Sequence, residues 1–336
     1  MTAKKSLTSQ TFGDWAQVAI AKHTAKVLKH EVEVLRDRDP EQLHQMRIGM
    51  RRLRSAIVGF APALDFPESI NDQKIGKVAK VLGQLRDLDV LQDRIQQEAQ
   101  FQLPAKEQQT LQQVIKKLKK QRKQALKRVQ ETLTDQPYQY LKKELQGWLA
   151  QPNYQMIAAL PMREVLSALL LPQISQLLLH PGWLVGVKFK AGKMKLSQNI
   201  SPKKLDRLLE VQGKLLHSLR KEAKRTRYQM ELFTPFYSER YKYYLKQVKQ
   251  IQVVLGQMQD DCVIFDFLHQ SCGLDSEKKL PILVQKLRDN SYQQWQKWTL
   301  LQDIFLDCAT REDLNLSLII DTNNKNKDEK QQKILT

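Results

Sequence analysis

The amino-acid sequence predicts an all-α fold, and three observations lead to that prediction. Apolar residues recur at helical spacing in long segments and make up 41% of the 336 residues, as in a globular chain. Glycine and proline are scarce, at 12 residues each. Most prolines stand at or near the ends of the periodic segments, where the missing N–H of proline disturbs a helix least.

Each periodic segment is expected to form one helix. The expected helices cover residues 10–37, 41–64, 68–99, 105–134, 137–150, 161–179, 203–233, 237–271, 277–289 and 291–310. The apolar run from Val165 to Leu179 is interrupted by Pro172 and is too short to cross a bilayer, so it predicts a buried helix. Alternating apolar residues between Trp183 and Leu196 favour a hairpin and a linker equally. The polar, lysine-rich residues 321–336 predict a disordered tail.

The charge of the chain indicates an anionic partner. Lys and Arg total 55 against 36 Asp and Glu, which gives a formal net charge of +19. Charge alone does not separate nucleic acid, anionic lipid and polyphosphate. The start of the chain lacks the pattern of a signal peptide, so we expect a cytoplasmic protein without a membrane partner. The three cysteines form no CxxC or Cys/His cluster, so we expect no metal site.

An internal repeat divides the chain into two related halves. His44 and His217 are each followed by basic residues 3, 7, 8 and 10 positions later, and each is followed after 38 residues by Leu-Gly-Gln. Equal spacing over that distance is hard to obtain by chance. We therefore expect a single helical domain over residues 10–310, with halves at about 10–150 and 161–310 joined near residues 151–160.

Each copy of the repeat places its basic residues on one face of a helix, because about 100° per residue aligns positions 0, 3, 7 and 10. The stripe spans about 15 Å, which suits a chain of phosphates better than one phosphate. Like charges four residues apart repel by roughly 0.2–0.5 kcal/mol per pair, and an anionic ligand would relieve that repulsion. Arginine favours phosphate because its planar fork donates two hydrogen bonds at once.

These residues resemble the signature of the CHAD family, named for its histidine-containing α-helical domain. The first copy reads His44-x-x-Arg47-x-x-x-Arg51-Arg52-x-Arg54, and later Leu82-Gly83-x-Leu85-Arg86-Asp87. The second copy, from His217 to Asp260, is similar to the second half of that domain. The resemblance implies two antiparallel helical-bundle halves related by pseudo-two-fold symmetry. Their basic helices would line a central groove or pore that binds inorganic polyphosphate.

The resemblance assigns the phosphate contacts to the basic residues in and beside the motif. They are His44, Arg47, Arg51, Arg52, Arg54, Arg86, His217, Arg220, Lys221, Lys224, Arg225 and Arg227. The two copies differ, because Lys224 keeps the charge of Arg51 without its fork and Gln259 stands where the first half has Arg86. We therefore expect the first half to hold phosphate more firmly than the second.

Further candidates lie outside the motif. Arg122 is in line with the apolar stripe of its helix, so we expect it, among the lysines around it, to point toward the groove. Lys246 belongs to a second basic face in the other half. Asp87 and Asp260 share a repeat position, and we expect each to pair with a basic residue of the neighbouring helix rather than to act in catalysis.

The expected function is therefore non-catalytic binding of polyphosphate, without a cofactor, in the cytoplasm at polyphosphate granules and beside polyphosphate-metabolising enzymes. No Walker A sequence or catalytic triad is apparent. Nucleic-acid binding is the alternative, although the basic stripes carry almost no aromatic residues for base stacking. A third possibility is an enzyme in which His44 and His217 accept phosphoryl groups or bind a metal, against which the adjacent cations argue.

Overall fold

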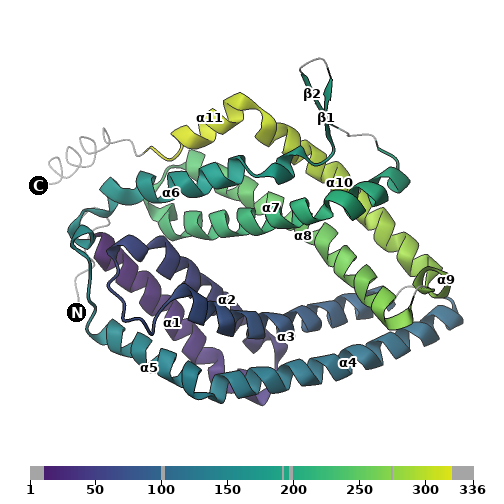
Figure 1. Cartoon of the computed structure of the whole chain (residues 1–336), viewed down its shortest axis with the longest axis horizontal. Helices are drawn as coiled ribbons and strands as arrows, with labels where there is room; N and C mark the ends of the chain where they lie inside the picture. The colour runs from purple at the N-terminus through teal and green to yellow at the C-terminus, as the bar shows by residue number, and fades with distance from the viewer. Residues whose placement is uncertain (1–10, 100–102, 191–192, 197–199, 274, 320–336) are drawn as a thin grey trace, which may run out of the picture.

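The computed structural model describes residues 11–99, 103–190, 193–196, 200–273 and 275–319. The first half holds α1 (Phe12–Arg36), α2 (Pro40–Gly59), α3 (Asp72–Ala99), α4 (Ala105–Thr134) and α5 (Gln136–Ala150). The second half holds α6 (Met162–Leu178), α7 (Pro202–Phe233), α8 (Glu239–Cys272), α9 (Ser276–Lys279), α10 (Pro281–Leu306) and α11 (Cys308–Leu316). The all-α prediction is confirmed (Figure 1).

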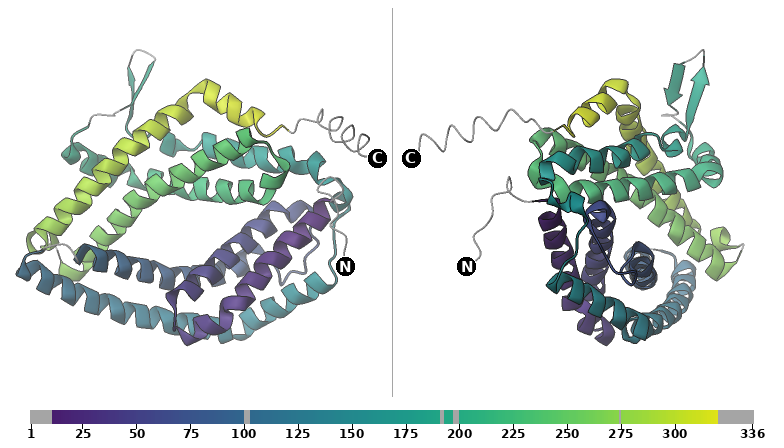
Figure 2. Two further views of the ribbon diagram at one scale, coloured as in Figure 1. Left: turned by 180° about the vertical axis from the view of Figure 1, so that it is seen from behind. Right: turned by 60° about the vertical axis from the view of Figure 1, so that its left-hand side comes forward.

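Short elements connect these helices. The 3₁₀ turns are η2 (Ala61–Ala63), η3 (Met156–Ala159), η4 (Pro181–Leu184) and η5 (Thr234–Phe236). Strands β1 (Val187–Lys190) and β2 (Lys193–Leu196) pair antiparallel, with Val187 opposite Leu196. This hairpin decides between the two alternatives that the sequence left open, and it projects away from the helices (Figure 2).

Side chains near the helix ends explain several boundaries. The Thr11 hydroxyl accepts from the Asp14 N–H at 3.1 Å, and the Asp14 carboxylate accepts from the Thr11 N–H at 3.2 Å, which closes a capping box at α1. Asp39 caps α2, whose first residue is Pro40. At Asp37 the backbone turns between these helices with a φ of 51°, in the left-handed region.

The end of the chain departs from the prediction. The expected break between residues 289 and 291 is wrong, because α10 continues through it to Leu306. The break comes instead at Asp307, whose carboxylate accepts from the Thr310 N–H at 2.8 Å and begins α11. The expected tail at 321–336, like residue 10, lies outside the described residues.

Helix α6 passes through Pro172 without ending. Contrary to the expectation that this run is too short, the segment Met162–Leu184 has the length and composition of a candidate membrane span within the described residues, a test that buried core helices also pass. In this structure Leu166, Leu170 and Ile174 are completely buried in the core. That packing agrees with the predicted buried helix.

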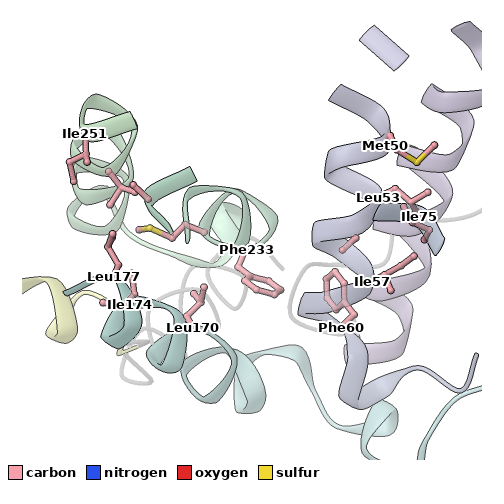
Figure 3. Packing of buried hydrophobic residues seen from close by; sticks show 14 of the residues in the cluster. Met50, Leu53, Ile57, Phe60, Ile75, Leu170, Ile174, Leu177, Phe233 and Ile251 are labelled. Carbon is pink, nitrogen blue, oxygen red and sulfur yellow. The ribbon is translucent and has the colours of Figure 1, made fainter. Parts of the chain in front are cut away.

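The two halves share one large apolar core at the crossing of α2 and α7. The rings of Phe60 and Phe233 meet edge to face with centroids 5.5 Å apart, and Phe233 points toward the first half in Figure 3. Beside them the Gln229 amide donates to the Ser55 carbonyl at 3.0 Å. Gly59 allows this close approach, because a methyl group there would overlap the Gln229 side chain.

A second, smaller apolar cluster joins the halves at the far ends of their long helices. It contains Ile95 and Leu118 of the first half and Leu268 and Leu283 of the second. Arg94 donates to Asp261 at 2.7 Å beside it. The halves therefore meet at two separated places, as the views of Figures 1 and 2 agree.

The segment that connects the halves is fixed to the first half. Tyr154 forms an isolated β-bridge with Leu64, and Pro161 forms another with Thr11. The Gln155 N–H donates to the Ala63 carbonyl at 3.0 Å. Residues 151–161 therefore pack as part of the structure and do not separate two independent units.

Because a single core spans both halves, Phe233→Ala should lower the free energy of unfolding by about 3–5 kcal/mol, as for other buried phenylalanines. Chemical denaturation should still show one transition, since both halves depend on that core. Phe189→Ala on the exposed hairpin is the matched control and should change stability by less than about 0.5 kcal/mol. Two separate transitions would contradict the shared core.

Candidate anion-binding site

The repeated arginines Arg47 and Arg220 are held in the same way in both halves. Arg47 of α2 lies across Gly83 of α3, where a methyl group would be 3.5 Å from its Nε, and its Nη2 is 3.1 Å from Asp87. Arg220 of α7 lies across Gly256 of α8, where a methyl group would be 3.3 Å from its Nε. Its Nη2 is 3.9 Å from Asp260.

This arrangement explains the equal spacing in the sequence. The glycine follows the arginine by 36 residues in both halves (83 − 47 and 256 − 220), and the aspartate follows by 40 (87 − 47 and 260 − 220). The arginine packs closely over the glycine, more tightly at Gly256 than at Gly83, and the aspartate one helical turn later orients the guanidinium. The prediction that Asp87 and Asp260 pair with basic residues of the neighbouring helix is confirmed.

Arg51 and Lys224, at equivalent repeat positions, come together where α2 and α7 cross. Both are half-buried, and among the described residues neither has a carboxylate within 4 Å. Burial, together with the weaker effect of the charges of Arg51, Arg47 and Arg220, lowers the pKa of Lys224 to about 7, against the opposing effect of Asp87.

Burial and neighbouring positive charges also lower the pKa of Arg51, which belongs to the first half. Its pKa is lowered to about 10, mainly by burial and in part by the charges of Arg47, Arg227 and Arg52. Asp260 of α8 also faces this group and interacts with Lys224. The described residues therefore place cations from both halves at the centre of the site and carboxylates at its edge.

An aromatic ring lies among these cations. Tyr228 of α7 is 4% exposed, and its ring centroid is 4.4 Å from Cζ of Arg51 and 4.4 Å from Cζ of Arg227. Its buried hydroxyl has no hydrogen-bond partner among the described residues. The sequence predicted no role for Tyr228. The signal was a large ring at the repeat position where the first half has Ser55.

The two histidines occupy equivalent positions near the start of each stripe. The Nδ1 atoms of His44 and His217 are buried and have no hydrogen-bond partner among the described residues. Burial lowers the pKa of both, and positive neighbours, chiefly Arg86 for His44 and Lys221 for His217, lower it further. The side chain of Gln259 has the opposite effect on His217 through a hydrogen bond. Both histidines are therefore largely neutral at pH 7.

Four other basic residues of the motif are paired with carboxylates. Arg52 and Arg227 share Glu231, at 3.2 and 3.4 Å. Nη2 of Arg54 donates to Asp72 at 2.7 Å, and Nη1 of Arg225 donates to Glu222 at 2.7 Å. Of the other predicted residues, Arg86 of α3 is half-buried and acts on His44, whereas Lys221 and Lys246 are exposed.

Arg122 lies in a separate environment on α4. It donates twice to Asp37 and once to Asp89, each at 2.7 Å, and these bonds raise its pKa. It thereby joins the α1–α2 turn, α3 and α4 into one unit. Because its three hydrogen bonds are made within the protein, we leave Arg122 out of the phosphate contacts proposed below.

Comparisons with known proteins agree with this architecture. The chain resembles the crystal structure of the CHAD domain from the plant Ricinus communis, with a TM-score of 0.54 and 21% identity over 93% of this chain and 92% of that one. It also resembles PptA from Streptomyces chartreusis, with a TM-score of 0.59 and 15% identity over 87% and 99%. No curated protein sequence matches the chain. The sequence profile of the CHAD domain matches residues 18–269, so the chain belongs to the CHAD domain family.

Proposed function

We propose that this protein binds long-chain inorganic polyphosphate between α2 and α7, without catalytic activity of its own. The observation that carries the proposal is the meeting of Arg51 and Lys224, one from each half, without a carboxylate partner among the described residues. Half-buried cations held together in this way destabilise the unliganded protein, and a bound anion would remove that cost.

The surrounding residues favour phosphate as that anion. Arg47 and Arg220 are oriented by single carboxylates and keep further N–H donors, and a guanidinium can offer two parallel donors to one phosphate group. His44 and His217 stand at the start of the two stripes, and the buried Nδ1 of each has no hydrogen-bond partner among the described residues. Because the imidazoles are largely neutral, they add hydrogen bonds without increasing the repulsion among the cations.

The extent of the stripes favours a polymer over a single phosphate. The eleven residues from His44 to Arg54 rise about 15 Å along α2, and the equivalent residues rise as far along α7. One phosphate contacts only part of either stripe. A flexible chain of phosphates can follow both, and each added contact releases counterions, which strengthens binding.

Nucleic acid fits this site less well, because the aromatic ring within it is inaccessible. Base-stacking proteins present exposed rings, whereas Tyr228 is almost fully buried between guanidinium groups. The direct test titrates the purified protein with polyphosphate of several lengths and with duplex DNA of equal charge. Affinity should rise with chain length and exceed that for DNA. Equal affinity for both polymers would refute the proposal.

The location and partners follow from the proposed ligand. We propose that the protein acts in the cytoplasm at polyphosphate granules, beside enzymes that make or degrade the polymer. A fluorescent fusion should co-localise with the granules and should disperse when Arg51 and Lys224 are changed to Gln. Unchanged localisation of that variant would show that another surface directs it.

Changing Arg51 and Lys224 together to Gln should weaken polyphosphate binding by about 100-fold, since two charged hydrogen-bonding groups are lost at about 1.5 kcal/mol each. The melting temperature should hold or rise, because repulsion is relieved. The matched control changes Lys119 and Lys120, which are exposed on α4, to Gln and removes the same charge. If the control weakens binding equally, net charge and not the site determines affinity.

Binding should weaken as the pH rises above about 7. Lys224 has a pKa near 7 without ligand, and an adjacent phosphate raises it toward the usual 10.5, so binding takes up a proton in this window. Affinity should fall by at most about tenfold per pH unit between pH 7 and 9.5. Lys224→Arg keeps the charge fixed and should flatten this profile. An equal slope in that variant would contradict the assignment to Lys224.

A further inference from the structure

Tyr228 brings together two arginines that lie on different helices of different halves. Arg51 comes from α2 and Arg227 from α7, and each places its Cζ 4.4 Å from the centroid of the same ring. The ring is buried, so its contacts with the two guanidinium groups are shielded from water.

Without the ring, the two guanidinium groups would move apart. Like charges repel more strongly when they are removed from water, and the guanidinium of Arg51 is largely buried. The negative face of an aromatic ring attracts a guanidinium, by up to about 2 kcal/mol in a desolvated site. A ring that attracts both groups therefore opposes their separation before any ligand arrives.

The ring also orients the groups for a ligand. A guanidinium that stacks on a ring keeps its N–H donors in its own plane, directed away from the ring face. The Nε of Arg51 is buried and has no hydrogen-bond partner among the described residues. Arg227 retains one carboxylate neighbour, Glu231.

We propose that Tyr228 is a positioning residue, whose ring holds Arg51 and Arg227 as a paired clamp for polyphosphate across the two halves. The inference rests on the proposed function and adds a residue to it. The clamp is built from one ring at the crossing of α2 and α7. The equivalent residue of the first half is Ser55, whose carbonyl accepts from Gln229.

The test varies the ring at position 228 while keeping its shape. Tyr228→Phe keeps the stacking face and should bind long-chain polyphosphate within about twofold of the wild type. It should be equally or more stable, because it removes a buried hydroxyl without a partner. Phenylalanines with increasing ring fluorination lose the negative face, so affinity should fall stepwise, to about tenfold weaker for the most fluorinated ring.

The salt dependence of binding separates positioning from charge. Fluorination leaves every cation in place, so the slope of log K against log salt should stay unchanged while affinity falls. Arg51→Gln should instead reduce the magnitude of that slope by about one phosphate contact. In the fluorinated background, Arg51→Gln should cost less affinity than in the wild type, because the two changes disrupt one interaction.

The possible failures are distinct. If the wild type does not bind polyphosphate, the proposed function fails. If it binds and fluorination has no effect, the positioning role of Tyr228 is wrong while the proposed function stands. If Tyr228→Phe weakens binding as much as full fluorination, the hydroxyl contacts the ligand and the ring is not the positioning element.

Discussion

Repulsion between cations of the two halves is the constraint on which this structure depends. Arg51 and Lys224 are brought together against their own electrostatics by apolar packing on either side of them. On one side, Phe60 meets Phe233 at the crossing of α2 and α7. On the other, the far ends of the long helices join in a second apolar cluster. Hydrophobic burial is non-directional and scales with area, so these two contacts can hold the charges close.

Carboxylates are distributed unevenly around that cluster. At the edges, Asp87 orients Arg47 and Asp260 lies near Arg220, whereas the described residues place no carboxylate within 4 Å of the central pair. Exposed ion pairs of this kind add little to stability, with typical values of about 0–1 kcal/mol. Their effect is geometric, since they fix the direction of the arginines. The described part of the site therefore combines oriented arginines at its edge with a central pair of cations that no carboxylate contacts.

The sequence predicted much of this arrangement, for identifiable reasons. The positions of the prolines predicted most helix boundaries. The equal spacing from His44 and His217 to Leu-Gly predicted that each aspartate pairs with a basic residue of the neighbouring helix. It did not anticipate the continuous α10, where no proline marked an end. It also did not anticipate Arg122 binding Asp37, because periodicity gives the face of a helix but not a partner 85 residues away. The place of Tyr228 between two arginines depends on how α2 and α7 cross, which no local pattern records.

The close contact of arginine and glycine has a mechanical consequence. Helix α3 continues for 16 residues beyond Gly83 (99 − 83), and α8 continues for 16 beyond Gly256 (272 − 256), or about 24 Å in each case. Each glycine therefore lies at the point from which a long helical segment extends to the outer apolar cluster. A methyl group would make ordinary contact with Arg47 at Gly83, at 3.5 Å, and a slightly tight contact with Arg220 at Gly256, at 3.3 Å. A side chain larger than that of alanine would have to displace the arginine or the helix, and any tilt of the helix would grow toward the outer apolar cluster. The two smallest residues of the motif therefore lie where a large side chain would most disturb the alignment of distant parts of the molecule.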